Sequence, residues 1–187
     1  MQVIETTLRD VKRIRPKRFG DERGWFAEVF NTSTFAAHGL PRSFVQDNQS
    51  LSCRGVLRGL HYQLGKPQGK LVRVISGHIW DVAVDLRRDS PDFGRYAGFD
   101  LKQGTESDNL DSLWIPEGFA HGFLVLSETA EVLYKTTDLY HPEGERCIRW
   151  DDATLKIDWP LAGMTPAVSD KDSKGSAFAD AELPPIG

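Results

Sequence analysis

The sequence predicts an all-β fold, a sandwich or jelly roll, and three observations support this prediction. Short strand-like segments recur along the chain, and turn sequences such as Gly65-Lys66-Pro67 separate most of them. There is no strand–helix–strand repeat, and no glycine-rich loop precedes a long helix, which argues against Rossmann and P-loop enzymes. At about 150 residues per domain, a chain of 187 residues is expected to form one domain, residues 1–187.

The expected elements follow from apolar spacing and from turn signals. Apolar side chains at every second position on both sides of Ser76-Gly77-His78 predict a hairpin over residues 70–86. A short helix is expected over Thr32–His38, closed by Gly39. Prolines, small residues and charges indicate an irregular C-terminal segment over 162–187, packed on the domain. The other expected strands are 25–30, 44–50, 55–62, 96–101, 112–115, 121–126, 131–137 and 146–150.

Composition narrows the classes of function. With 23 basic and 27 acidic residues the formal charge is −4, which argues against an electrostatic nucleic-acid binder. No apolar stretch approaches the roughly 18–20 residues of a membrane-spanning helix, so no membrane partner is expected. The start of the chain lacks the pattern of a signal peptide, and Cys53 and Cys147 cannot form a disulfide framework. We therefore expect a reduced, cytoplasmic protein.

Two of the five histidines occur in informative contexts, whereas His38, His78 and His141 are read as structural. In a regular strand over 57–63, His61 shares a face with Leu57, Gly59 and Gln63, unless a bulge intervenes. Apolar and polar residues do not separate between the two faces of this segment, which indicates a cavity wall.

The second informative histidine, His121, follows the sequence Pro116-Glu117-Gly118-Phe119-Ala120. This Pro-x-Gly-x-x-His pattern resembles the second motif of the cupins, which are small jelly rolls whose histidine points into the barrel. Metal-binding cupins carry His-x-His in their first motif, but here the matching stretch reads His61-Tyr62-Gln63. A metal would have too few nitrogen ligands, so no metal cofactor is expected.

Charged and aromatic residues beside the expected strands suggest an anionic ligand. Arg23, Arg58 and Arg73 suit phosphate, because the planar guanidinium group matches phosphate oxygens. Lys70 on a cavity wall would add a fixed positive charge, and Tyr134 is equally consistent with a core aromatic whose hydroxyl lies at the surface. The basic run over 12–18 is a solvated edge segment or an anion contact.

Several segments, in this order, resemble one family, the dTDP-4-dehydrorhamnose 3,5-epimerases. The resemblance covers roughly residues 3–175. It implies a cupin jelly roll, a homodimer that exchanges strands, and dTDP-4-dehydro-6-deoxy-D-glucose as substrate, epimerised at C3 and C5 for dTDP-L-rhamnose synthesis. The matching segments are Phe19–Gly24, Phe44–Asn48, Leu57–Gln63, Gly69–Arg73, Trp114–Phe123 and Tyr134–Thr137.

The resemblance also implies roles for particular residues. His61 would be the base that removes a proton next to the ketone, and Asp172, or Asp170 beside it, would orient that histidine. Lys70 would stabilise the enolate oxygen, and Tyr134 would return a proton on the other face. The residues implied to contact nucleotide and sugar are Arg23, Glu28, Gln46, Asp47, Asn48, Arg58, His121, Glu145 (or Glu143, by a shifted alignment) and Lys171.

Three other functions remain open at the level of sequence. A relative that inverts only C3 or only C5 would keep the same base, because regiochemistry depends on how the sugar ring turns in the pocket. A non-catalytic nucleotide-sugar-binding cupin would keep the arginines but not the full set of His61, Lys70, Tyr134 and a C-terminal aspartate. A metal-dependent cupin enzyme would purify with near-stoichiometric metal.

Overall fold

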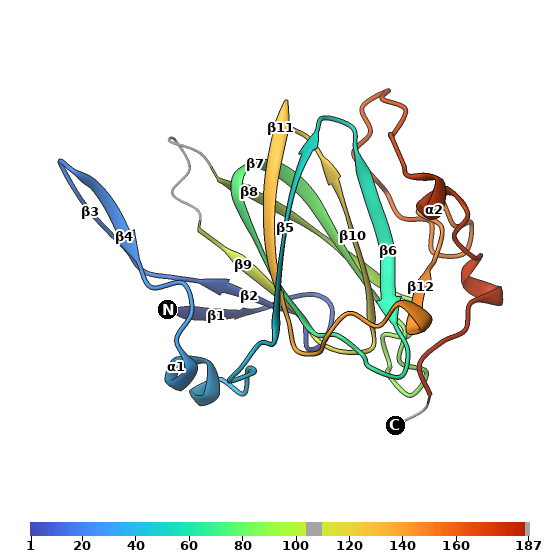
Figure 1. Cartoon of the computed structure of the whole chain (residues 1–187), viewed down its shortest axis with the longest axis horizontal. Helices are drawn as coiled ribbons and strands as arrows, with labels where there is room; N and C mark the ends of the chain where they lie inside the picture. The colour runs from blue at the N-terminus through green and yellow to red at the C-terminus, as the bar shows by residue number, and fades with distance from the viewer. Residues whose placement is uncertain (104–109, 186–187) are drawn as a thin grey trace.

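Two antiparallel sheets face each other in this computed structural model, which describes residues 1–103 and 110–185 (Figure 1). The first sheet has the order β1 (Gln2–Glu5), β2 (Lys12–Arg15), β9 (Ser112–Ile115), β7 (Lys70–Asp85), β11 (Thr129–Thr136) and β5 (Gln46–Cys53). The second has the order β8 (Tyr96–Gln103), β7, β10 (Phe119–Val125), β6 (Leu57–Gln63) and β12 (Glu145–Cys147). This double sheet confirms the predicted jelly roll.

The expected hairpin over 70–86 is wrong, because these residues form one strand, β7, that belongs to both sheets. Val72 and Val74 face the interior before Gly77, whereas Ile79 and Ala83 do so after it, so the inward positions change parity there. Gly77 has a φ of +87°, and a Cβ on it would lie 2.2 Å from a backbone oxygen of the neighbouring strand. The ladder with β11 shifts register at Ile75, just before Gly77, so the turn signal accompanies a bulge that bends the strand and does not reverse it.

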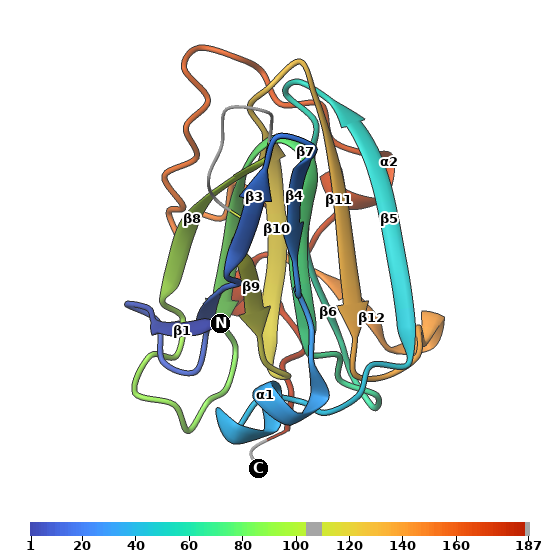
Figure 2. The same ribbon diagram turned by 90° about the vertical axis from the view of Figure 1, so that its left-hand side faces the viewer.

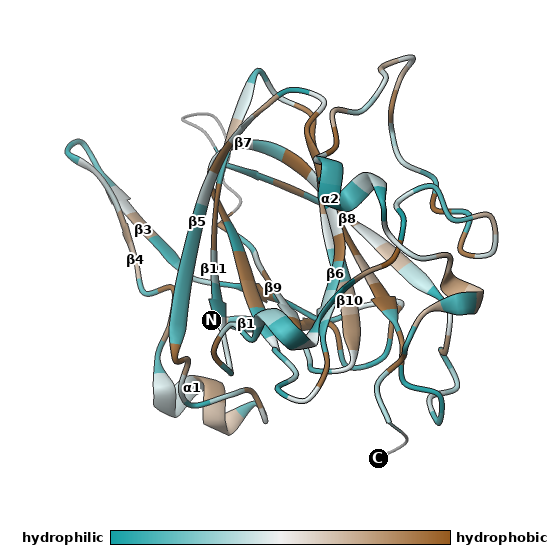
Figure 3. Ribbon diagram, turned by 45° about the vertical axis from the view of Figure 1, so that its right-hand side comes forward, coloured by the Kyte–Doolittle hydropathy of each residue, from teal (hydrophilic) through white to brown (hydrophobic). Residues whose placement is uncertain are grey.

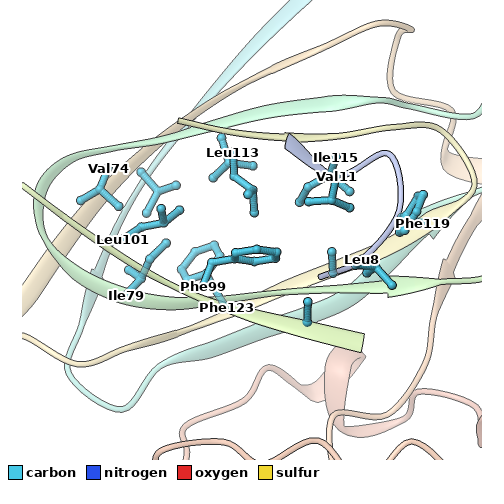
Figure 4. Close-up of a cluster of buried hydrophobic side chains, with 14 of the residues drawn as sticks. Leu8, Val11, Val74, Ile79, Phe99, Leu101, Leu113, Ile115, Phe119 and Phe123 are labelled. Atoms are coloured by element: carbon cyan, nitrogen blue, oxygen red, sulfur yellow. The ribbon is translucent and has the colours of Figure 1, made fainter. Parts of the chain in front are cut away.

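The space between the sheets is filled at one side by apolar side chains. Phe99, Leu101 and Ile79 come from the second sheet and meet Leu113 and Ile115 of the first (Figure 4). Each of these side chains is almost fully buried. The opposite side, between β5 and β11 on one sheet and β6 and β12 on the other, carries polar side chains instead, and β5 is mostly hydrophilic (Figure 3).

The C-terminal segment covers the outer face of the second sheet. Its apolar side chains, including Val168 and Phe178, pack in one cluster with Leu60, Val82 and Leu124 of the sheet. It also contains the short helix α2 (Asp170–Ser173) and the 3₁₀ turn η2 (Phe178–Asp180), whereas η1 (Pro142–Gly144) precedes β12. The segment expected to be irregular therefore brings a helix close to β6.

The predicted helix is α1 (Thr32–Ala37), which ends one residue earlier than expected. Asn31 caps it by accepting hydrogen bonds from the N–H groups of Ser33 and Thr34. Phe35 anchors the helix in a third apolar cluster on the outer face of the first sheet.

Three strands near the N-terminus, β1, β2 and β3 (Arg18–Asp21), were not expected, and β3 pairs with the expected strand β4 (Gly24–Ala27) in a separate hairpin. This hairpin projects away from the sheets (Figures 1 and 2). β2 contains most of the basic run and pairs with both β1 and β9, so the run does not lie at a sheet edge. Among the described residues, no helix is long and apolar enough to cross a membrane.

Candidate functional site

A cavity of about 350 Å³ lies between the sheets on their polar side. Its walls come from β5 and β11 of the first sheet, from β6, β10 and β12 of the second, and from the start of β7. Side chains from both sheets therefore converge on one space. The lining residues are Gln46, Asn48, Ser50, Arg58, His61, Tyr62, Gln63, Gln68, Lys70, His121, Gly122, Phe123, Tyr134, Tyr140 and Glu145.

A bulge in β6 brings two functional side chains to the same wall. Arg58 and His61 both line the cavity, although they are three residues apart in a strand. The pairing with β10 shifts register at this point. Gly59 has a φ of +110°, and a Cβ there would lie 2.6 Å from the Cα of Gly122. Strict alternation over 57–63 is therefore wrong, and the bulge left open in the sequence analysis is present.

His61 forms a hydrogen-bonded pair with Asp172. Its Nε2 lies 2.7 Å from Oδ1 of Asp172, and the Gly59 N–H donates to Oδ2 at 3.2 Å. The carboxylate is almost fully buried, whereas the histidine side chain is about one-third exposed. Burial alone would raise the pKa of Asp172, but the hydrogen bonds from His61 and Gly59 hold it below its usual value.

The ionised Asp172 accepts the Nε2 proton, and Nδ1 of His61 is left with its lone pair. Of the two candidate aspartates, the structure places Asp172 in this contact. Ser169 caps α2 by accepting from the Asp172 N–H at 3.1 Å, which fixes the turn that carries the carboxylate.

A second buried group combines Lys70, Asp81 and His121. The Nε2 atom of His121 lies 2.8 Å from Oδ2 of Asp81, a carboxylate that is fully buried. The Lys70 ammonium donates to the backbone carbonyl of His61 at 3.1 Å. Burial lowers the pKa of Lys70 to about 8, and the negative charges of Asp81 and Glu145 limit that fall. A cation is thus held in the cavity wall, next to the backbone of His61.

Tyr134 and Arg58 face this group from different strands. Tyr134 stands on β11, in the sheet opposite His61, and burial raises the pKa of its phenol. The hydroxyl is therefore protonated at neutral pH and can donate a proton. Arg58 donates through Nε to the Ser52 hydroxyl at 3.1 Å and remains exposed. A mostly free guanidinium at the cavity wall is suited to binding an anion.

Polar residues form the outer part of the cavity. The Gln46 amide donates to Asn48 and accepts from the Tyr140 N–H, at 3.0 and 2.9 Å. The Tyr140 hydroxyl donates to Glu145, which also pairs with Lys171. Burial would raise the pKa of Glu145, but these two partners hold it below its usual value. The structure thus places Glu145 at the cavity, and Glu143 is not among the lining residues.

The residues present do not fit a cupin metal site. At the position of the second histidine, the Gln63 side chain bonds the backbone of the loop beside it. It donates to the carbonyls of Lys66 and Leu139 and accepts from the His141 N–H. With its amide committed to holding this loop, Gln63 supplies no ligand.

Four predicted contact residues are not among those that line the cavity of their own chain, and one of them, Lys171, pairs with the lining residue Glu145. Arg23 lies in the turn of the β3–β4 hairpin, paired with Asp21. Glu28 accepts a hydrogen bond from Asn31, also outside the cavity. Asp47 points to the face of β5 opposite to Gln46 and Asn48, where it pairs with Lys135.

Several lining residues were missed by the sequence analysis. Ser50 follows Gln46 and Asn48 at spacing two, and this alternation would have found it. Its hydroxyl is buried and has no hydrogen-bond partner among the described residues. Tyr140 carries no comparable signal, since a loop places it. The other missed residues are Tyr62, Gln63, Gln68, Gly122 and Phe123.

The sequence and the fold are both similar to those of known proteins. The family model described as dTDP-4-dehydrorhamnose 3,5-epimerase matches residues 5–180. The chain is 55 % identical over 186 residues to the dTDP-4-dehydrorhamnose 3,5-epimerase of Pseudomonas aeruginosa, covering 99 % of this chain and 100 % of that protein. It is 52 % identical over 184 residues to that of Shigella flexneri, covering 97 % and 98 %.

A solved structure shares the architecture as well. The dTDP-6-deoxy-D-glucose-3,5-epimerase of Legionella pneumophila was crystallised in complex with dTDP-4-keto-L-rhamnose. It superposes with a TM-score of 0.92 at 46 % identity, covering 98 % of this chain and 97 % of that one. The likeness therefore extends over the cavity as well as the sheets.

Proposed function

The chain belongs to the dTDP-4-dehydrorhamnose 3,5-epimerase family, and from this premise we propose that it converts dTDP-4-dehydro-6-deoxy-D-glucose into dTDP-4-dehydro-L-rhamnose. The reaction is an isomerisation that inverts C3 and C5, the two carbons next to the C4 ketone. It serves dTDP-L-rhamnose synthesis. The ketone already present in the substrate acidifies both C–H bonds, so a base, an oxyanion partner and an acid suffice.

One observation carries this proposal. His61 and Tyr134 line the same cavity from opposite sheets, so a sugar ring between them meets a base on one face and an acid on the other. Inversion needs this arrangement, because the proton must leave one face of the carbon and return to the other. A pocket that only bound the nucleotide sugar would not require it.

In the proposed step, His61 Nδ1 accepts the proton from carbon, and the C–H electron pair forms the enolate. The Lys70 ammonium stabilises the charge that develops on the C4 oxygen. The Tyr134 hydroxyl then donates its proton to the opposite face of the carbon. Asp172 stabilises the imidazolium formed at His61, which lies 2.7 Å away. Solvent exchange restores both groups before the next turnover.

Binding of the nucleotide portion is assigned to the outer part of the cavity. Arg58 is proposed to contact the diphosphate, because its guanidinium is exposed there and can form paired hydrogen bonds to phosphate oxygens. The amides of Gln46 and Asn48 and the hydroxyl of Ser50 are proposed to hydrogen bond the ligand. Ser50 in particular lacks another partner among the described residues.

We further propose a homodimer in which each chain completes its partner's cavity. The β3–β4 hairpin exposes Phe19, Trp25 and Phe26, and the exposed fraction of Phe26 reaches 70 %. Apolar side chains on a projecting hairpin favour burial against another chain. Insertion of this hairpin into the partner would bring Arg23 and Glu28 to a nucleotide that their own chain cannot reach.

Complementation between two inactive variants tests this dimer. His61→Ala and Arg23→Ala chains, mixed and reassociated at equal amounts, would restore about a quarter of wild-type activity, since half the dimers carry one intact site of two. No recovery in the mixture would contradict a site shared between chains.

The reaction is tested by incubation with dTDP-4-dehydro-6-deoxy-D-glucose in heavy water, followed by mass spectrometry and proton NMR. Deuterium at both C3 and C5, with L-configured product trapped by a downstream reductase, is the expected result. Deuterium at one carbon would make the protein a single-centre epimerase. No deuterium at either carbon would leave a binding protein.

A further inference from the structure

Cys147 lies beside the His61–Asp172 pair and has no role in the proposed reaction. β12 pairs with β6 so that Cys147 is directly opposite His61. The adjacent pair, Leu60 and Ile148, exchanges both backbone hydrogen bonds at 3.0 Å. Cys147 and His61 therefore form a non-hydrogen-bonded pair, the arrangement that brings opposite side chains closest together.

These three side chains offer a nitrogen, a sulfur and an oxygen to one point. Their ligand atoms all lie within 4.8 Å of one another. Among the described residues, this is the one cluster in which three potential metal ligands come so close together. Ligand atoms of tetrahedral zinc are about 3.3–3.8 Å apart, given bond lengths of about 2.0–2.3 Å, so modest side-chain rotations would close the site. A fourth position would remain for water.

We propose that His61, Cys147 and Asp172 bind a zinc-like divalent cation, and that the bound ion switches off the base. This site differs from the metal site of cupins, which uses the His-x-His positions and would need a ligand at Gln63. The metal here is an inhibitor and not a cofactor. The loss of activity rests on the proposed role of His61 as base, whereas binding of the ion does not.

The protons balance in a way that explains the inhibition. The ion takes the place of the proton between His61 Nε2 and Asp172 Oδ1, and that proton moves to Nδ1. The Cys147 S–H bond breaks, its proton leaves to solvent, and the thiolate binds the ion. With Nε2 on the metal and a proton on Nδ1, the imidazole has no lone pair left to accept a proton from carbon.

The surrounding charges favour a cation over a free thiolate. Burial, with the negative charges of Asp172 and Glu145, raises the pKa of the Cys147 thiol to about 12, while Lys171 acts in the opposite direction. Without metal the thiol is therefore protonated and chemically quiet. Its contact with the Ile148 carbonyl, at 3.5 Å, is weak. Gly59 holds the other oxygen of Asp172, which leaves Oδ1 for the ion.

Cobalt provides a direct test, because Co²⁺ adopts zinc-like sites and thiolate ligation adds a charge-transfer absorption in the near ultraviolet. Chelator-treated wild-type protein is titrated with Co²⁺ and then with Zn²⁺. The exposed Cys53 offers a matched control. We expect the absorption in wild type and in Cys53→Ser, its displacement by Zn²⁺, and its loss in both Cys147→Ser and Cys147→Ala. Absence from wild type, or persistence in the Cys147 variants, would overturn the site.

Deuterium exchange into substrate separates binding from inhibition. Zn²⁺ is expected to abolish exchange in wild type, with recovery on adding chelator. Cys147→Ser should exchange at the wild-type rate without metal and require at least about tenfold more Zn²⁺ for inhibition. If the Co²⁺-loaded protein shows the thiolate absorption but Zn²⁺ leaves deuterium exchange unchanged, the proposed inhibition by the bound ion is overturned. That result would also count against His61 as the base.

Discussion

Two histidine–aspartate pairs face the same cavity, and they are built in different ways. His121 and Asp81 stand on the adjacent strands β10 and β7, where the ladder places Asp81 opposite Phe123, two positions from His121. His61 instead receives Asp172 from a segment 111 residues further along the chain. The first pair is fixed by strand register, whereas the second is completed only when the C-terminal segment docks.

The difference in construction matches a difference in exposure. The His121 side chain is 8 % exposed and that of His61 is 32 % exposed. The accessible pair can meet a substrate and exchange protons with solvent. The buried pair is suited to fixing charge, because Asp81 also acts electrostatically on Lys70. This contrast fits the proposed function, in which the accessible pair transfers the proton and the buried pair positions the groups around it.

The largest expected effect separates the two histidines directly. His61→Ala should lower exchange at both C3 and C5 by about 10³-fold or more, because it removes the general base. The Kd of the nucleotide sugar should stay within a few-fold of wild type, because Arg58 and the side-chain amides of Gln46 and Asn48 remain. His121→Ala should instead weaken binding while measurable exchange persists. Calorimetry and deuterium exchange on both variants test this, and an equal loss of exchange would erase the distinction.

The next comparison replaces the two carboxylates. Asp172→Asn should reduce kcat by roughly 10²-fold with little change in KM, since the amide no longer stabilises the imidazolium or fixes the tautomer of His61. Asp81→Asn should have a smaller effect on kcat at neutral pH. Steady-state kinetics on both variants at one pH provides the test. A larger loss from Asp81→Asn would mean that the buried pair carries the proton transfer.

A third prediction concerns stability. Lys70 has a pKa of about 8 in place of 10.5, so holding its charge in the fold costs on the order of 3 kcal/mol. Lys70→Met, of similar length, should therefore abolish exchange and yet raise the free energy of unfolding at pH 7 by about 1–3 kcal/mol.

The pH dependence of this difference follows from the protons bound. Between about pH 8 and 10.5 the unfolded chain holds the Lys70 proton and the folded chain does not, so wild-type stability gains as pH rises. The advantage of Lys70→Met should shrink over that range. Urea unfolding at several pH values measures it, and a constant difference would contradict a buried ammonium.

The same contrast between register and docking explains what the sequence could predict. Alternating apolar residues and turn residues predicted most strands, because each signal is local. The hairpin over 70–86 was wrong because the strand is bulged just before Gly77, and a glycine signal does not distinguish a bend from a reversal. Spacing could not decide whether β6 is bulged at Gly59 either, since that bulge depends on close contact with the backbone of Gly122 on the neighbouring strand.

For the site, the resemblance to the family supplied His61, Lys70, Tyr134 and Asp172, which the structure brings together around one cavity. Spacing alone could not pair His61 with Asp172, because docking of a distant segment makes that contact. Spacing also could not show that Arg23 lies away from the cavity of its own chain, because packing between elements sets the direction of the β3–β4 hairpin.

The smallest expected effect tests how the buried pair acts on its surroundings. If protonated Lys70 stabilises the enolate, kcat/KM should fall as pH rises through about 8, because neutral lysine offers no charge. The charge of Asp81 raises the pKa of Lys70, so Asp81→Asn should move this alkaline limb to lower pH, by about half to one pH unit. Asp172→Asn should leave the limb in place, since Asp172 pairs with His61 and not with Lys70. If the alkaline limb shifts in Asp172→Asn but not in Asp81→Asn, the limb reports the titration of a group other than Lys70. The charge that controls the cavity would then come from the docked C-terminal segment and not from the sheet.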